Sequence, residues 1–103
     1  LTCADAVGLG CMEAVRDNEA YADMQIYGVD GLEAAVQGII DGTYTATVFQ
    51  DARMLAEQNL LAAYKLLTGE VDNIDLVYDD LLVTAENAEE VLPYAPVKGD
   101  VLP

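Results

Sequence analysis

The sequence has 103 residues, 53% of them hydrophobic, which suits one small domain with a modest core and argues against a disordered chain. Nineteen acidic residues against four basic ones give a formal net charge of −15, so a nucleic-acid backbone or an anionic membrane surface would repel the protein. No histidine is present, and we expect the two cysteines, Cys3 and Cys11, to be free, buried, small apolar residues rather than metal ligands or a disulfide.

The first predicted unit is the end of a strand at residues 1–4 followed by a helix over residues 5–16. Asp5 is a favourable N-cap, and an inward stripe at helical spacing follows it: Ala6, Leu9, Met12 and Val15. Because residues 1–4 resemble only the last part of a strand, the sequence suggests a mature or cut fragment of something longer.

The middle unit has the sharpest pattern. Residues 24–27 read as a strand, residues 28–31 as a turn that carries Asp30, and residues 32–40 as a helix that Asp41 and Gly42 close. One buried helix face is indicated by the spacing of Leu32, Ala35, Val36, Ile39 and Ile40.

A third strand at residues 44–49 is rich in β-branched and aromatic residues and ends at Gln50. Asp51 then caps a long helix, residues 52–68, with Gly69 as its left-handed terminator. Since the apolar residues of this helix form more than one stripe, we expect it to be covered on more than one side.

The last part of the chain is expected to hold short elements. An acidic turn at residues 70–75 precedes two β-type stretches, 76–78 and 81–83, and a short helix over residues 85–92 with Thr84 as its cap. The tail from Pro93 carries all three prolines and is expected to be extended or disordered.

Alternating strands and helices predict an α/β fold of parallel βαβ units. In such a sheet ligands bind at the carboxyl ends of the strands, where Asp5, Asp30 and Gln50 fall. We therefore expect Asp30 and Gln50 to lie side by side at one edge, facing a cleft. So few strands leave an unpaired sheet edge, which points to missing chain or to a partner.

The chemistry of these candidates suits a neutral sugar, whose hydroxyls need acceptors that take two donors and amides that both donate and accept. The alternative for Asp30 is a turn residue before a glycine, and for Gln50 a surface polar residue at a strand end.

The order of motifs resembles the C-terminal third of type 1 periplasmic (solute) binding proteins of the ribose/galactose-binding family. The similar segments, over residues 1 to about 92, are Ala4-Asp5-Ala6-Val7-Gly8-Leu9-Gly10, Ile26-Tyr27-Gly28-Val29-Asp30-Gly31, Ala46-Thr47-Val48-Phe49-Gln50-Asp51, Leu66-Leu67-Thr68-Gly69-Glu70 and Leu82-Val83-Thr84-Ala85-Glu86-Asn87.

The resemblance implies Rossmann-like lobes, present here in part, and assigns roles to single residues. Asp30 would accept hydrogen bonds from sugar hydroxyls, and Gln50 would contact the sugar at the hinge between the lobes. Ala4 stands where the family usually has a ligand-binding Asn, so Asp5 is a weaker third ligand candidate and better interpreted as a helix cap.

The resemblance also implies the organisation and the partners. Residues 1–50 would belong to the C-terminal lobe, residues 51–80 to the N-terminal lobe, and residues 81–103 to the return crossing, short helix and tail. The protein would be a sugar-binding component of an ABC uptake system, periplasmic or extracellular and lipid-anchored or secreted. Its partners would be a small-molecule sugar, the transporter permease and the rest of its own chain or a second chain, with no nucleic acid, cofactor or enzymatic activity. The isolated 103 residues should bind sugar weakly or undetectably.

Three other interpretations compete with this one. The effector-binding core of a LacI-type regulator shares the fold, although those regulators commonly carry an acidic residue where Gly31 stands. A metal-dependent hydrolase could use the carboxylates of Asp72, Asp75, Asp79 and Asp80, whose spacing matches no calcium loop. A structural module could assemble through an exposed sheet edge.

Overall fold

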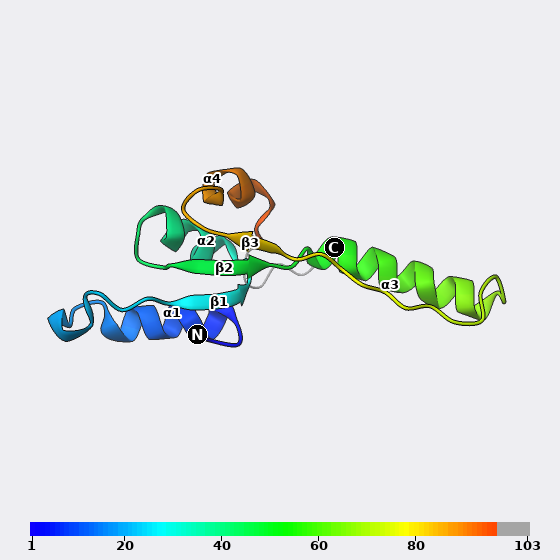
Figure 1. The fold of residues 1–103 in the computed structure, drawn as a ribbon, viewed down its shortest axis with the longest axis horizontal. Coiled ribbons are helices and arrows are strands. Elements are labelled where there is room, and N and C mark those ends of the chain that lie inside the picture. The colour runs from blue at the N-terminus through cyan, green and yellow to red at the C-terminus, as the bar shows by residue number, and fades with distance from the viewer. Residues whose placement is uncertain (97–103) are drawn as a thin grey trace.

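A three-stranded sheet forms the centre of the computed structural model, which describes residues 1–96 (Figure 1). The strand order is β1 (Tyr27–Asp30), β2 (Ala46–Phe49), β3 (Leu81–Val83). Strands β1 and β2 are parallel, as predicted, whereas β3 runs antiparallel to β2. The antiparallel β3 corrects the expectation of parallel units throughout. It follows from the route of the chain, which leaves the carboxyl end of β2 through a long helix and comes back to the sheet at that same end.

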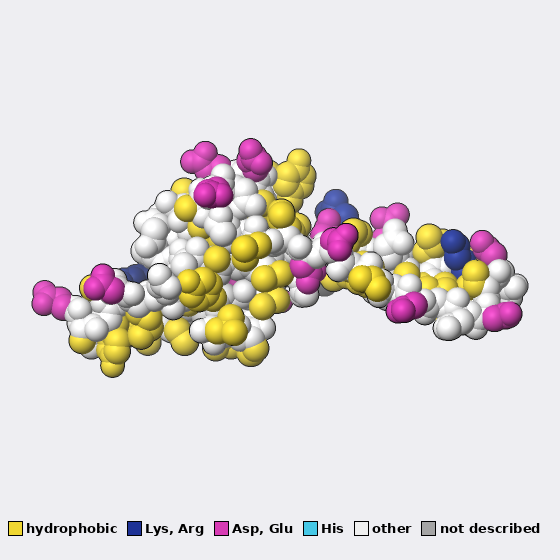
Figure 2. All heavy atoms as spheres, viewed as in Figure 1, with side chains coloured by type: hydrophobic (Ala, Val, Ile, Leu, Met, Phe, Trp, Pro, Cys, Tyr) yellow, Lys and Arg dark blue, Asp and Glu magenta, His cyan; other side chains and the backbone are white. Residues whose placement is uncertain are grey.

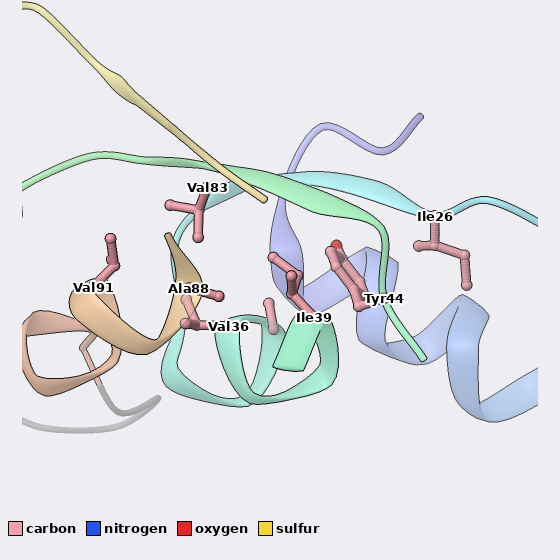
Figure 3. Close-up of a cluster of buried hydrophobic side chains, with 8 residues drawn as sticks. Ile26, Val36, Ile39, Tyr44, Val83, Ala88 and Val91 are labelled. Carbon is pink, nitrogen blue, oxygen red and sulfur yellow. The ribbon is translucent and has the colours of Figure 1, made fainter. Parts of the chain in front are cut away.

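The core lies between the strands and three helices: α1 (Asp5–Val15), α2 (Glu33–Ile40) and α4 (Ala88–Val91). Figure 3 shows the side chains of Ile26, Val36, Ile39, Tyr44 and Val83 spread along this layer, between the strands and the helices. Val36 and Val83 are fully buried. The periodicity of residues 32–40 therefore identified the buried face of α2 correctly, since Ala35, Val36 and Ile39 all belong to the core.

The long helix α3 (Ala52–Leu67) extends away from the sheet and gives the molecule extents of 60 × 25 × 24 Å (Figure 1). Asp51 caps it as predicted, accepting a hydrogen bond from the Met54 N–H at 3.0 Å, and Gly69 follows its end at φ 73°. The expected cover is not found among the described residues, because α3 has no buried residue and Leu60 and Leu67 are 73% and 88% exposed. Figure 2 shows hydrophobic side chains on the surface of this part of the molecule.

The amino-terminal elements differ from the expectation in three ways. Residues 1–4 form no strand, although the Thr2 N–H donates to the Tyr27 carbonyl at 2.8 Å. Strand β1 lies three residues later than predicted, so Asp30 ends the strand rather than sitting in a turn. The N-cap of α1 is Ala4 and not Asp5, and Ala6 is exposed. The reason is that the Asp5 side chain points into the core, so the buried side of α1 begins at Asp5 and Gly8.

The carboxyl-terminal region also departs from the prediction. Residues 76–78 form no strand, and the N-cap of α4 is Asn87 rather than Thr84. Pro93 lies in a 3-10 turn, η2 (Leu92–Tyr94), while an earlier turn of this kind, η1 (Glu19–Tyr21), lies in the predicted loop after α1. The rest of the predicted tail, residues 97–103, lies outside the described residues. Both cysteines are free, as predicted, but exposed rather than buried.

Candidate functional site

Asp30 and Gln50 lie side by side at the carboxyl ends of two adjacent parallel strands. Asp30 is in register with Phe49, and the Gln50 backbone N–H donates to the Asp30 carbonyl at 3.2 Å. Both residues are partly buried. The structure thus confirms the predicted juxtaposition of the two residues at one sheet edge, and it follows from the parallel pairing of β1 with β2.

The backbone at Asp30 is in an unusual conformation. Its φ is 116°, which makes it the one non-glycine residue with positive φ among residues 1–96, and Gly31 follows at φ 77°. Such a conformation costs on the order of 1–3 kcal/mol and persists only where the surroundings impose it. Gly31 also packs against Phe49, because a Cβ at residue 31 would lie 2.5 Å from a ring carbon of that residue. The glycine after Asp30 is therefore required by both its φ and its packing.

The Asp30 carboxyl group has a raised pKa. Burial is the larger cause and the nearby Asp5 carboxylate the second, while a backbone hydrogen bond with Asp5 partly offsets them. A carboxylate that has lost part of its hydration gains from hydrogen-bond donors that a ligand brings. Sugar hydroxyls are donors of this kind.

The Gln50 side chain connects the two ends of the segment that leaves the sheet after β2, forms α3 and returns to the sheet at β3. Its amide Nε2 donates to a carboxylate oxygen of Asp80 at 3.3 Å, just before β3 begins. Asp80 therefore lies at the same edge as Asp30 and Gln50. The local sequence pattern places Asp80 only in an acidic surface cluster, since nothing in it indicates a partner 30 residues away.

Asp5 is wholly buried at 0% exposure, and four groups donate to its carboxylate. Oδ2 accepts the backbone N–H groups of Gly31 at 2.8 Å and Leu32 at 2.9 Å. The Thr47 hydroxyl lies 2.7 Å from Oδ1 and 2.9 Å from Oδ2, and the Tyr44 hydroxyl donates to Oδ1 at 3.1 Å. The third site candidate thus lies beneath the turn that follows Asp30, with its oxygens occupied by protein groups.

Two residues of this network, Tyr44 and Thr47, were not identified from the sequence. Burial and the Asp5 carboxylate raise the pKa of Tyr44, which keeps its hydroxyl protonated as a donor. Thr47 is 1% exposed within an otherwise apolar strand, and a buried hydroxyl at such a position is the signal that could have indicated a polar partner. Gly28 leaves room for the network, because a Cβ there would overlap the Asp5 carboxylate and the Tyr44 hydroxyl.

Within residues 1–96, no three His, Cys, Asp or Glu side chains lie together as metal ligands would, so the acidic cluster at residues 72–80 has no geometry that favours the hydrolase interpretation.

A cavity of about 200 Å³ lies near the amino ends of β1 and β2 and involves none of the candidate site residues; it is lined by Met12, Val15, Arg16, Tyr21, Ala22, Met24, Ile26, Gly42 and Thr43. None of the helices described here has the length and apolar character needed to cross a membrane.

Comparison with known proteins gives a consistent assignment. The sequence model of a family described as "periplasmic binding protein domain" matches residues 1–71. A xylitol-binding protein of Mycolicibacterium smegmatis is 26% identical over 90 residues. Among solved structures, an ABC transporter solute-binding protein from Bacillus halodurans with bound myo-inositol superposes with a TM-score of 0.78 at 30% identity. A Mycobacterium smegmatis protein in complex with β-D-fucofuranose gives 0.75 at 27% identity.

These matches cover most of this chain and a minor part of each relative. The alignment spans 87% of this chain and 26% of the xylitol-binding protein. The two superpositions each span 88% of this chain, with 31% of the inositol-bound protein and 30% of the fucofuranose-bound one. The 103 residues therefore span between a quarter and a third of the length of these relatives.

Proposed function

The chain belongs to the periplasmic binding protein family, and from that premise we propose that it supplies part of the sugar-binding cleft of a solute-binding protein that serves an ABC uptake system outside the cytoplasm. The permease of that system would be its protein partner. The two finer elements of this proposal, the ligand class and the division into lobes, rest on separate observations.

The observation that carries the ligand-binding role is the pairing of Asp30 with Gln50 at one sheet edge. Asp30 offers a partly dehydrated acceptor, and Gln50 offers an amide that both donates and accepts. Adjacent sugar hydroxyls present alternating donors and acceptors that suit this pair. We propose Asp30 and Gln50 as direct ligand contacts, with Asp5 beneath them.

The ligand class is proposed as a neutral sugar or polyol. The relatives are named for, or were solved with, xylitol, myo-inositol and β-D-fucofuranose, which are uncharged polyhydroxylated molecules. The formal net charge of −15 supports a neutral rather than an anionic ligand.

The division into lobes is supported by the path of the chain. After Gln50 the chain leaves the sheet as α3, which buries no residue, and it returns at β3 beside the strand that it left. We propose that residues 1–50 and residues 81–96 belong to one lobe, and that α3 and the following segment belong to another. The 103 residues would then be the C-terminal third of a longer protein whose remainder completes the cleft and covers α3.

The test is titration calorimetry of the complete protein that contains these residues, against a panel of neutral sugars and polyols. We expect one member to bind, and Asp30→Ala to weaken that binding by roughly 10-fold to 100-fold, since a hydrogen bond to a charged group contributes about 1.5–3 kcal/mol. Asp72→Ala, which removes a carboxylate from the exposed acidic turn, is the matched control and should bind as the parent does.

Two results would contradict the proposal. If no neutral sugar or polyol binds, the assigned ligand class is wrong. If Asp30→Ala and Gln50→Ala both bind as tightly as the parent, the sheet edge is not the site. The isolated 103 residues should give no measurable heat, and binding at millimolar concentrations would contradict the division between lobes.

A further inference from the structure

We propose that Asp5 is a positioning residue for the sugar site: its buried carboxylate fixes the backbone around Asp30 so that the Asp30 side chain is presented to the ligand. This inference rests on the proposed function, and it replaces direct ligand contact by Asp5 with an indirect role. Three observations carry it.

The first observation is the choice of groups that Asp5 binds. Its Oδ2 accepts the N–H groups of Gly31 and Leu32, which are the two peptide groups directly after Asp30. Holding both peptides on a single oxygen fixes the turn that follows Asp30. Asp30 itself has a φ of 116°, a conformation that needs such external restraint.

The second observation is that the Asp5 carboxylate is itself held in place. Thr47 donates to it from β2, and Tyr44 donates from the segment before β2. Donors on both oxygens leave the carboxylate no freedom to rotate away from the turn. One buried group thus connects α1, the turn after β1 and strand β2, which are the elements that place Asp30 beside Gln50.

The third observation is the space that the sequence leaves for this group. Cβ atoms at Gly8 and Gly28 would overlap the Tyr44 hydroxyl, and the one at Gly28 would also overlap the Asp5 carboxylate. Leu32, the N-cap of α2, makes no side-chain cap bond of its own, so the Asp5 carboxylate also provides a negative charge near the start of α2. The positions of Gly8 and Gly28 and the absence of a side-chain cap on α2 then have one explanation, which is that the Asp5 carboxylate occupies this space.

The alternative is that Asp5 only stabilises the fold. Two variants separate the two roles. Asp5→Asn keeps an oxygen for the Gly31 and Leu32 N–H groups, and its NH2 group can donate to the hydroxyls of Tyr44 and Thr47, which also accept. Asp5→Ala removes all of these bonds. Asp5→Asn therefore keeps the shape of the parent side chain and its hold on the turn, whereas Asp5→Ala loses both.

The experiment measures sugar affinity and its pH dependence in the complete protein, using the neutral sugar or polyol that the parent binds. We expect Asp5→Ala to lose about 10-fold or more in affinity and Asp5→Asn to retain most of it. Because Asp5→Asn removes one negative charge beside Asp30, the acid side of its affinity profile should move to lower pH. Asp5 is the charged group that acts on the Asp30 carboxyl, while Tyr44, which donates to Asp5, and Asp80, which accepts from Gln50, are unchanged in the variant.

Amide hydrogen exchange distinguishes failure of this inference from failure of the proposed function. If the parent binds no sugar, the proposed function fails, but Gly31 and Leu32 should still exchange about 10-fold or more faster in Asp5→Ala than in Asp5→Asn. If Asp5→Ala does not fold, Thr47→Val, which removes one donor to the carboxylate, should show smaller changes of the same sign. The positioning role would be overturned if a folded Asp5→Ala protein kept the parent's affinity. It would also be overturned if the Gly31 and Leu32 amides exchanged as slowly in folded Asp5→Ala as in Asp5→Asn.

Discussion

A single methyl group added at residue 28 should lower the melting temperature sharply, because Gly28 faces the buried carboxylate network. An alanine Cβ there would overlap the carboxylate of Asp5 and the hydroxyl of Tyr44, and it would lie 3.2 Å from the Asp5 Cα. Overpacking of this kind costs about 1–3 kcal/mol. Moving the carboxylate would also leave buried N–H groups unpaired, at about 1–3 kcal/mol each.

The two contributions together give at least about 2 kcal/mol for Gly28→Ala. In a domain of this size each kcal/mol corresponds to about 4–8 °C, so the melting temperature should fall by at least about 8 °C. The assay is thermal unfolding followed by far-ultraviolet circular dichroism. Gly10→Ala is the matched control, since Gly10 lies in α1 with nothing within 4 Å of the place that an alanine Cβ would take, and this variant should gain up to about 1 kcal/mol from helix propensity. A Gly28→Ala protein that melts at or above the temperature of Gly10→Ala would refute the reasoning.

The contacts and exposures described above lead to three further predictions. The native pKa of Asp30 is raised above the unfolded value of 3.8, so the native state binds the proton more tightly, and stability falls as pH rises from 3.8 through the raised pKa and stays reduced above it. Asp30→Asn should therefore raise the melting temperature more at pH 7 than at pH 3, and a larger gain at pH 3 would contradict this sign. Asp51→Ala removes the α3 cap and should cost about 0.5–2 kcal/mol of helix stability, visible as faster amide exchange in the first turn of α3 and unchanged exchange in β1. Leu67→Ala, at a residue 88% exposed, should change the stability of the 103-residue chain by less than about 0.5 kcal/mol, whereas a larger loss in the complete protein would show that another part of that protein covers α3.

The local sequence pattern was sufficient to predict most of the helices and strands and to predict that Asp30 and Gln50 lie side by side. The periodicity of residues 32–40, the β-branched run before Gln50 and the cap at Asp51 all depend on residues within a few positions of one another. Once β1 and β2 are parallel neighbours in this register, Asp30 and Gln50 must meet, because Asp30 is the last residue of β1 and Gln50 directly follows β2. The prediction failed where local signals are ambiguous. Residues 76–78 form a short apolar run but no strand, and the strand predicted at residues 24–27 lies three residues too early because Gly28, Asp30 and Gly31 are typical turn residues.

The sequence by itself determined the α/β class, the helices that flank the two parallel strands, and the placement of Asp30 and Gln50 at the carboxyl ends of those strands, because hydrophobic spacing and turn residues act over a few positions. Only the tertiary structure decided what Asp5 does. A local rule assigns an aspartate at that place to a helix cap, but its actual partners lie 26 to 42 residues away and come together only when α1, β1 and β2 pack. The same holds for the antiparallel β3 and for Asp80, because their positions depend on where the long segment that contains α3 returns to the sheet. Contacts over such separations are fixed by packing and by the need to satisfy a buried charge, neither of which has a short-range signature in the sequence.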